Sequence, residues 1–157
     1  MTLYHGSTID IEKVDLALSK PNKDFGRAFY LSDDRQQALE MAQFRAEFEE
    51  TEPVVNVYEF DETLFQEFRY KRFESYTEEW AHFVYDHRTE PHGRTLHNYD
   101  IVYGPIANDR VGAQIARYKQ GYITFDEFLR RIQYIKGITF QYAFCTQRAI
   151  DKLQKIL

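Results

Sequence analysis

Leu3-Tyr4-His5-Gly6-Ser7 and Asp24-Phe25-Gly26-Arg27-Ala28-Phe29-Tyr30-Leu31-Ser32 are the two stretches that decide the fold. The second alternates as a half-buried strand does, which should bury Phe29 and Leu31 and leave Tyr30 free. In the first, the histidine precedes a glycine, whose backbone can be approached closely because it has no Cβ. We therefore expect two short strands that present an imidazole and a phenol on a shared surface.

The order of these motifs resembles that of a known superfamily. A His-Gly-Ser strand, a Gly-x-x-x-Tyr strand and a late polar residue resemble the ADP-ribosyltransferases of the diphtheria-toxin and poly(ADP-ribose) polymerase type. The late residue is Gln141, in a strand expected over Ile138–Thr146, at the place where many of these enzymes carry Glu. The segment Asp100–Asp109 resembles a small bacterial branch of the superfamily. The resemblance covers almost the whole chain.

The resemblance implies a fold and a reaction. The fold is α+β, with a split, twisted mixed sheet and surrounding helices, formed by residues 1–157 as a single domain. NAD would bind between the His5 and Tyr30 strands, and ADP-ribose would pass to a macromolecular acceptor as nicotinamide leaves. Small bacterial domains of this type often serve as toxins or effectors, some neutralised by a partner protein.

The resemblance also implies roles for individual residues. His5 would bond a ribose hydroxyl, the Gly6 backbone would pair with the nicotinamide carboxamide, and Tyr30 would stack on the nicotinamide ring. Gln141 would bond the nicotinamide ribose, completing a catalytic set with His5 and Tyr30. Two further residues beside Gly26 could meet the phosphates or the adenine ribose. The expected NAD-binding residues are His5, Gly6, Ser7, Asp24, Gly26, Arg27 and Tyr30.

Two other functions remain open. His5, Tyr30 and Gln141 each also fit an ordinary structural role in a strand. Because Gln141 lacks the charge of Glu, the chain could be an inactive module that holds NAD or ADP-ribose, and an NAD glycohydrolase is a further alternative. On the sequence alone, Gln141→Glu should keep or raise turnover, since a carboxylate complements an oxocarbenium-like transition state.

Composition and charge exclude several classes of protein. The 157 residues are 43% hydrophobic and include 13 Phe and 12 Tyr, enough for a packed core. Residues 1–62 carry 14 acids and 6 bases, whereas residues 63–157 carry 11 acids and 14 bases, so the N-terminal part is too acidic for broad nucleic-acid binding. We find no signal peptide or membrane-spanning run, and we expect a soluble, cytoplasmic protein.

Neither metal nor thiol chemistry is indicated. The lone Cys145 excludes an internal disulfide and a Cys-based zinc site, and its apolar strand predicts a structural thiol with a raised pKa. Phosphate-binding glycine motifs are absent. Most of the histidines recur every five residues, which matches no metal-binding spacing, so we expect no metal and surface or loop positions for them. These are His82, His87, His92 and His97.

Periodicity and capping residues predict the remaining elements. Ser32 or Asp33 should cap a helix to about Glu50, with Ala38, Met41, Ala42, Arg45 and Phe48 at helical spacing. We also expect a strand or loop over residues 14–18, a central strand over 54–60, a loop over 88–99 and a buried strand over 100–103. Three further helices should be capped by Thr77, by Asn108 or Asp109 (to Lys119), and by Thr124 (to Ile135), the first with Trp80, Phe83, Val84 and His87 on one stripe. A terminal helix capped by Thr146 should carry Ala149, Ile150, Leu153 and Leu157.

Overall fold

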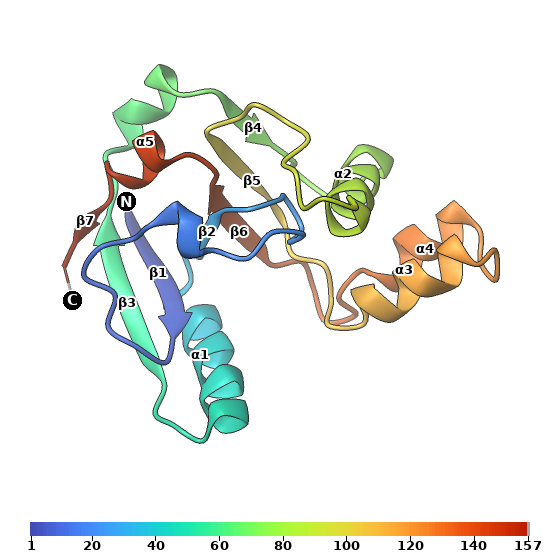
Figure 1. The fold of residues 1–157 in the computed structure, drawn as a ribbon, viewed down its shortest axis with the longest axis horizontal. Coiled ribbons are helices and arrows are strands. Elements are labelled where there is room, and N and C mark those ends of the chain that lie inside the picture. Colours follow the sequence, from blue (N-terminus) through green and yellow to red (C-terminus); the bar gives the residue numbers. More distant parts are fainter. Residues whose placement is uncertain (157) are drawn as a thin grey trace.

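The computed structural model describes residues 1–156 and confirms the α+β class: helices surround two β-sheets (Figure 1). The first sheet is antiparallel, with order β1-β3-β7, and the second is mixed, with order β2-β6-β5-β4 and a parallel β4–β5 pair. Both sheets join strands from the two ends of the chain, and β3 is central in its sheet, as the sequence predicts. The strands are β1 (Thr2–Ser7), β2 (Phe29–Leu31), β3 (Val54–Glu59), β4 (Tyr70–Arg72), β5 (Ile101–Pro105), β6 (Phe140–Phe144) and β7 (Gln154–Lys155).

One residue pair joins the two sheets. The Tyr4 N–H donates to the Ser32 carbonyl at 2.8 Å, and the Ser32 N–H donates to the Tyr4 carbonyl at 2.8 Å. Tyr4 belongs to β1, and Ser32 directly follows β2. Within the described residues this bridge does not extend into a ladder, so β1 and β2 separate on either side of it.

The four-stranded sheet divides the core in two. Alternate side chains of β5 and β6 point to opposite faces, so Val102 and Ala143 pack with Phe25 and Trp80 on one face. Ile101 and its neighbours on the other face pack toward the first sheet. The strand β2 therefore lies between two packed layers, with Phe29 and Leu31 buried as predicted.

Helix α1 (Arg35–Glu49) packs on β1 through alanines. Asp34 caps it by accepting from the Gln36 N–H at 2.9 Å, one residue later than predicted. The buried residues are Ala38, Ala42 and Ala46. The helical stripe read from the sequence is therefore only partly right, since Met41 and Phe48 are 55% and 87% exposed.

Helix α2 (Glu78–Thr89) begins at the predicted cap, because the Thr77 hydroxyl accepts from the Trp80 N–H at 3.1 Å. The surface or loop placement of His87 is wrong: its side chain is 2% exposed. The helix continues to Thr89, so the His87 ring reaches the core, where its Nδ1 donates to the Phe83 carbonyl at 2.8 Å and its Nε2 accepts from the Leu96 N–H at 2.9 Å.

Asn108 links the start of α3 (Val111–Lys119) to the end of α4 (Phe125–Arg131) by hydrogen bonds. Asn108 Oδ1 accepts from the Arg110 N–H at 3.0 Å, and Nδ2 donates to the Arg131 and Gln133 carbonyls at 2.8 and 3.0 Å. The prediction that Asn108 or Asp109 caps α3 is wrong, since α3 starts after Arg110 without a side-chain cap. The predicted extension of α4 to Ile135 is also wrong, because the carbonyls of Arg131 and Gln133 accept hydrogen bonds from Asn108 where α4 ends.

The C-terminal segment leaves its helix early. Thr146 caps α5 (Gln147–Ile150) as predicted, but the chain then forms β7 beside β3, so the predicted longer helix is wrong. Leu157 lies outside the described residues. Two 3-10 helices, η1 (Leu16–Leu18) and η2 (Glu62–Glu67), complete the elements, and the strand or loop predicted over residues 14–18 is wrong because Asp15 caps a helical turn there. None of the helices within residues 1–156 is both long and apolar enough to cross a membrane.

Candidate functional site

The site begins where β1 and β2 separate. Tyr4 turns its N–H and carbonyl toward Ser32, and backbone groups two residues apart in a strand point to the same side. The peptide groups of Gly6 therefore point to the same edge of β1. If the antiparallel register continued from Tyr4 and Ser32, Gly6 would face Tyr30. The pairing stops before that point in the described chain, which leaves a split between these two residues.

His5 crosses the split. Its Nδ1 lies 2.6 Å from the Tyr30 carbonyl oxygen, which can only accept, so Nδ1 carries the proton. Burial lowers the pKa of His5 to about 4, more than the hydrogen bond to Tyr30 raises it, so the ring is neutral at pH 7. Nε2 is then an acceptor. It bonds no group among residues 1–156, and because no buried side-chain atom there lacks a partner, Nε2 contacts solvent.

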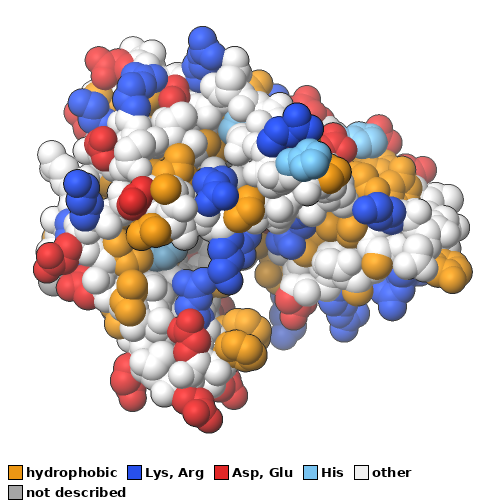
Figure 2. Space-filling view, viewed as in Figure 1, with side chains coloured by type: hydrophobic (Ala, Val, Ile, Leu, Met, Phe, Trp, Pro, Cys, Tyr) orange, Lys and Arg blue, Asp and Glu red, His pale blue; other side chains and the backbone are white. Residues whose placement is uncertain are grey.

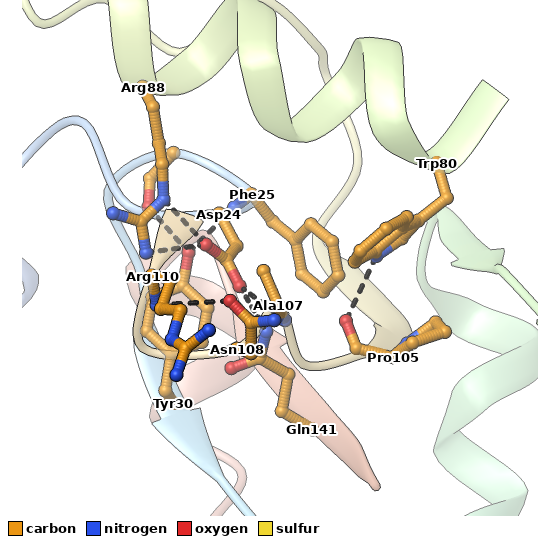
Figure 3. Close-up of polar contacts among 11 residues, drawn as sticks. Asp24, Phe25, Tyr30, Trp80, Arg88, Pro105, Ala107, Asn108, Arg110 and Gln141 are labelled. Carbon is orange, nitrogen blue, oxygen red and sulfur yellow. Dashed lines mark hydrogen bonds and ion pairs between the residues drawn. The ribbon is translucent and has the colours of Figure 1, made fainter. Parts of the chain in front are cut away.

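Tyr30 is half-buried and uses its hydroxyl inside the protein. The hydroxyl donates to the Gly26 carbonyl at 2.7 Å and accepts from the Phe25 N–H at 3.0 Å, which closes the turn before β2 (Figure 3). Burial, followed by the charge of Asp24, raises the pKa of Tyr30 well above its ordinary value. Tyr30 is thus less free than the strand alternation predicts, because its hydroxyl is bonded within the turn and its ring packs against the buried core.

Asp24 connects the turn to Gln141. The Asp24 carboxylate is 5% exposed and forms an ion pair with Arg88 of α2, at 2.7 Å between Oδ1 and Nη2. Its other oxygen, Oδ2, accepts from Gln141 Nε2 at 3.2 Å and from the Ala107 N–H at 3.4 Å. Figure 3 shows Tyr30, Asp24 and Gln141 converging from β2, the turn and β6. Gln141 therefore meets the turn that Tyr30 holds at the buried carboxylate of Asp24, and His5 is not among the residues that contact this carboxylate.

Glycine at position 6 is required by helix packing. A Cβ there would lie 2.1 Å from the Ala38 carbonyl oxygen, so α1 occupies the Cβ side of Gly6, whereas the Gly6 peptide groups lie on the edge of β1 that faces Tyr30. Gly26 has φ +88°, and a Cβ on it would meet His87 at 3.0 Å. Ser7 is buried. These positions shape the split rather than line it with side chains.

Arg27 points to the loop before it. Its guanidinium donates to the Ser19 carbonyl and, at 3.4 Å, to the Ala17 carbonyl, which ties η1 to the turn. Both acceptors are neutral backbone groups. Arg27 thus has a structural task that the sequence did not indicate.

Positive charge gathers beside the split. Burial and then repulsion from Arg88, Lys20 and Arg45 lower the pKa of Lys23. The charge of Arg45 also acts on His5, adding to the effect of burial on its pKa. Figure 2 shows a notch between α1 and the α3–α4 pair, with Lys and Arg side chains along its rim. Sequence analysis missed Arg45 and Arg88, because each lies on a helix surface far along the chain from the residues it approaches.

Two further kinds of group could carry chemistry, the thiol and the side chains that can bind a metal. Cys145 is 9% exposed, and burial raises its pKa to about 12, as predicted for a structural thiol. Within residues 1–156, no group of three or more His, Cys, Asp or Glu side chains is arranged to hold a metal ion.

The fold and the site define an α+β protein with two sheets that split at a His-Gly strand, where a neutral histidine bonds the Tyr30 carbonyl and, beyond the turn that Tyr30 holds, Gln141 bonds Asp24. A family model described as "Protein of unknown function (DUF3990)" matches residues 1–155, and the chain belongs to this family. A search of curated proteins and a search of solved structures each found no match.

Proposed function

We propose that this protein is an NAD-dependent mono-ADP-ribosyltransferase with the corresponding split-sheet fold. One observation carries the proposal: His5 of β1 bonds the Tyr30 carbonyl of β2, and Gln141 of β6 bonds Asp24 in the turn that the Tyr30 hydroxyl holds, so three residues far apart in the sequence are linked through neighbouring contacts. This is the order and strand context of the superfamily that the sequence resembles. The proposed reaction cleaves the bond between nicotinamide and ribose and transfers ADP-ribose to a macromolecular acceptor.

The geometry supplies groups suited to that reaction. Cleavage develops oxocarbenium-like charge on the ribose, so the sugar must be pinned while the nicotinamide is held flat. His5 Nε2 can accept from a ribose hydroxyl because Nδ1 is held by the Tyr30 carbonyl. The Gly6 peptide groups face the split and can pair with the carboxamide. The accessible part of the Tyr30 ring can stack on the pyridinium.

Charge supports a dinucleotide ligand. Burial lowers the pKa of Lys23, and the charges of Arg88, Lys20 and Arg45 lower it further, against the charge of Asp24. Binding an anionic pyrophosphate would relieve this repulsion. A neutral ligand would not.

Gln141 favours a second candidate, an NAD- or ADP-ribose-binding module without turnover. Gln141 can accept from a ribose hydroxyl through Oε1, but it places no charge beside the developing cation. An NAD glycohydrolase, in which water replaces the acceptor, uses the same groups. The three functions therefore differ in products and not in the ligand.

Nicotinamide release from NAD, measured with and without candidate protein or nucleic-acid acceptors, tests the proposal. A transferase releases nicotinamide and labels an acceptor, a glycohydrolase releases nicotinamide alone, and a binding module shows only a thermal shift with NAD. His5→Ala should abolish release, whereas His82→Ala, at an exposed position of α2 stacked on Phe125, should not. The absence of both a thermal shift and release at millimolar NAD would reject the proposal.

A further inference from the structure

The Gln141 amide has two ends, and only one of them suits a ribose hydroxyl. Oε1 accepts hydrogen bonds and Nε2 donates them, so the orientation of the amide decides what the site presents. Glutamine side chains can rotate by half a turn at little cost when nothing distinguishes the ends. A second group must therefore set the orientation.

Asp24 is that group by its position and chemistry. Its Oδ2 lies 3.2 Å from Gln141 Nε2, and its carboxylate is 5% exposed. An ionised carboxylate has no proton to donate, so it can face only the NH₂ end of the amide. Arg88 engages the other carboxylate oxygen, since its Nε and Nη2 both lie 2.7 Å from Oδ1, which leaves Oδ2 to face Gln141.

The remaining end of the amide points away from Asp24. Gln141 Oε1 bonds no group in the part of the chain that the structure describes, and no buried side-chain atom there lacks a partner, so Oε1 contacts solvent. Gln141 is on β6, a strand of the four-stranded sheet. The acceptor end is thus the end available to a ligand.

We propose that Asp24 is a positioning residue, which holds the Gln141 amide with Nε2 inward and Oε1 outward so that the site offers an acceptor to a ribose hydroxyl. The role of this hydroxyl rests on the proposed function, whereas the orientation of the amide does not. Arg88, Asp24 and Gln141 then act in series across α2, the turn before β2, and β6.

The first test observes the amide directly. In ¹⁵N-labelled protein, the Gln141 side-chain NH₂ signals, identified by their loss in Gln141→Ala, should be shifted and slow to exchange with solvent. Asp24→Asn should change both properties, because Asn can accept or donate and no longer distinguishes the two ends. Signals of a freely exchanging glutamine in the wild-type protein would overturn the proposal, even if Asp24→Asn did not fold.

Asp100→Asn is the matched control. Asp100 is also a buried aspartate, 6% exposed and 3.0 Å from Arg148, but it contacts Arg69 and Thr146 instead of Gln141. Its loss should leave the Gln141 signals unchanged. If Asp100→Asn and Asp24→Asn alter them equally, Asp24 has only a general structural role and the proposal fails.

Turnover separates this inference from the proposed function. In an active enzyme, Asp24→Asn should lower kcat on the order of 100-fold through misplacement of Gln141, with KM for NAD nearly unchanged. An unchanged kcat would overturn the positioning role. If the wild-type protein neither binds nor cleaves NAD, the proposed function fails, and the NH₂ signals still decide whether Asp24 orients Gln141.

Discussion

The Tyr30 hydroxyl has a structural role, and the proposed role in NAD binding belongs to the ring of the same residue. Its hydroxyl bonds the Gly26 carbonyl and the Phe25 N–H, so it holds the turn that carries Asp24. The residue as a whole is only partly buried, and it packs against the core. The resemblance to ADP-ribosyltransferases concerns the ring alone, and the structural work of the hydroxyl was not visible in the sequence.

Tyr30→Phe should therefore lower the free energy of unfolding. Removal of the hydroxyl leaves the Phe25 N–H and the Gly26 carbonyl without this partner, and each unsatisfied buried group costs about 1–3 kcal/mol. Urea denaturation of the variant and the wild-type protein measures the difference. NAD affinity should change little in Tyr30→Phe and fall by about 1 kcal/mol or more in Tyr30→Ala. Equal stability of Tyr30→Phe and wild type would contradict the role of the hydroxyl.

Gln141→Glu now carries a different expectation from that of the sequence alone. A second carboxylate would lie within about 3 Å of Asp24, at the site of the present 3.2 Å contact. Repulsion between them should raise the pKa of the new Glu and weaken the site, since like charges about 4 Å apart interact by roughly 4 kcal/mol near a protein surface.

The double variant Asp24→Asn/Gln141→Glu should recover turnover lost in Gln141→Glu. It exchanges the amide and the carboxylate and restores a donor–acceptor pair. The measurement is nicotinamide release for wild type, both single variants and the double variant. Additive losses in the double variant would show that positions 24 and 141 do not cooperate.

At the level of elements, the contact between β1 and α1 depends on the absence of a side chain. A Cβ on Gly6 would lie 2.1 Å from the Ala38 carbonyl oxygen and 2.9 Å from the Ala42 nitrogen. Both are backbone atoms of a helix, which cannot move aside as a side chain can. The same contact explains why α1 buries only alanines.

Gly6→Ala should destabilise the protein by about 1–3 kcal/mol or more through overpacking. Gly112→Ala is the matched control, because a Cβ on this α3 residue meets nothing within 4 Å. Gly112 lies in the first turn of α3, so this change should leave stability unchanged or raise it slightly. Thermal or urea unfolding measures both variants. Comparable stabilities for the two would contradict the close packing of β1 on α1.

At the scale of the whole molecule, several histidines are held neutral by packing. Burial lowers the pKa of His5 to about 4 from an ordinary value of 6.5. Burial also lowers the pKa of His87 and of His97, against hydrogen bonds to the Phe83 and Phe25 carbonyls that raise them. These rings come from β1, α2 and the segment after α2. Protonation of the buried histidines would therefore destabilise the folded state at several places in the molecule.

Stability should consequently fall as the pH drops below about 6.5. In that range the unfolded chain binds more protons than the folded one, because the histidine pKa values are lower in the folded state. The stability that these neutral histidines contribute is therefore complete above pH 6.5 and is lost as the pH falls toward their folded pKa values, which for His5 is about 4. Urea denaturation at pH 7 and pH 5 measures the effect, and His5→Asn should reduce its size. Equal stability at both pH values would show that these histidines titrate alike in both states.

The sequence by itself determined the local elements. Alternation placed β1, β2 and β6, with Phe29 and Leu31 buried. Threonines at the predicted caps start α2, α4 and α5, because an N-cap acts within a few residues of itself. The strands that carry His5, Tyr30 and Gln141 could therefore be found from residue order.

Tertiary structure alone decided which groups meet. Asp24 contacts Gln141 across 117 residues and Arg88 across 64, separations for which periodicity carries no information. Helix α1 turned its alanines inward, leaving Met41 and Phe48 exposed, because only a small side chain fits where its backbone approaches Gly6. Such contacts depend on the joint register of both sheets and on the space between layers, and these are fixed only when the whole chain has packed.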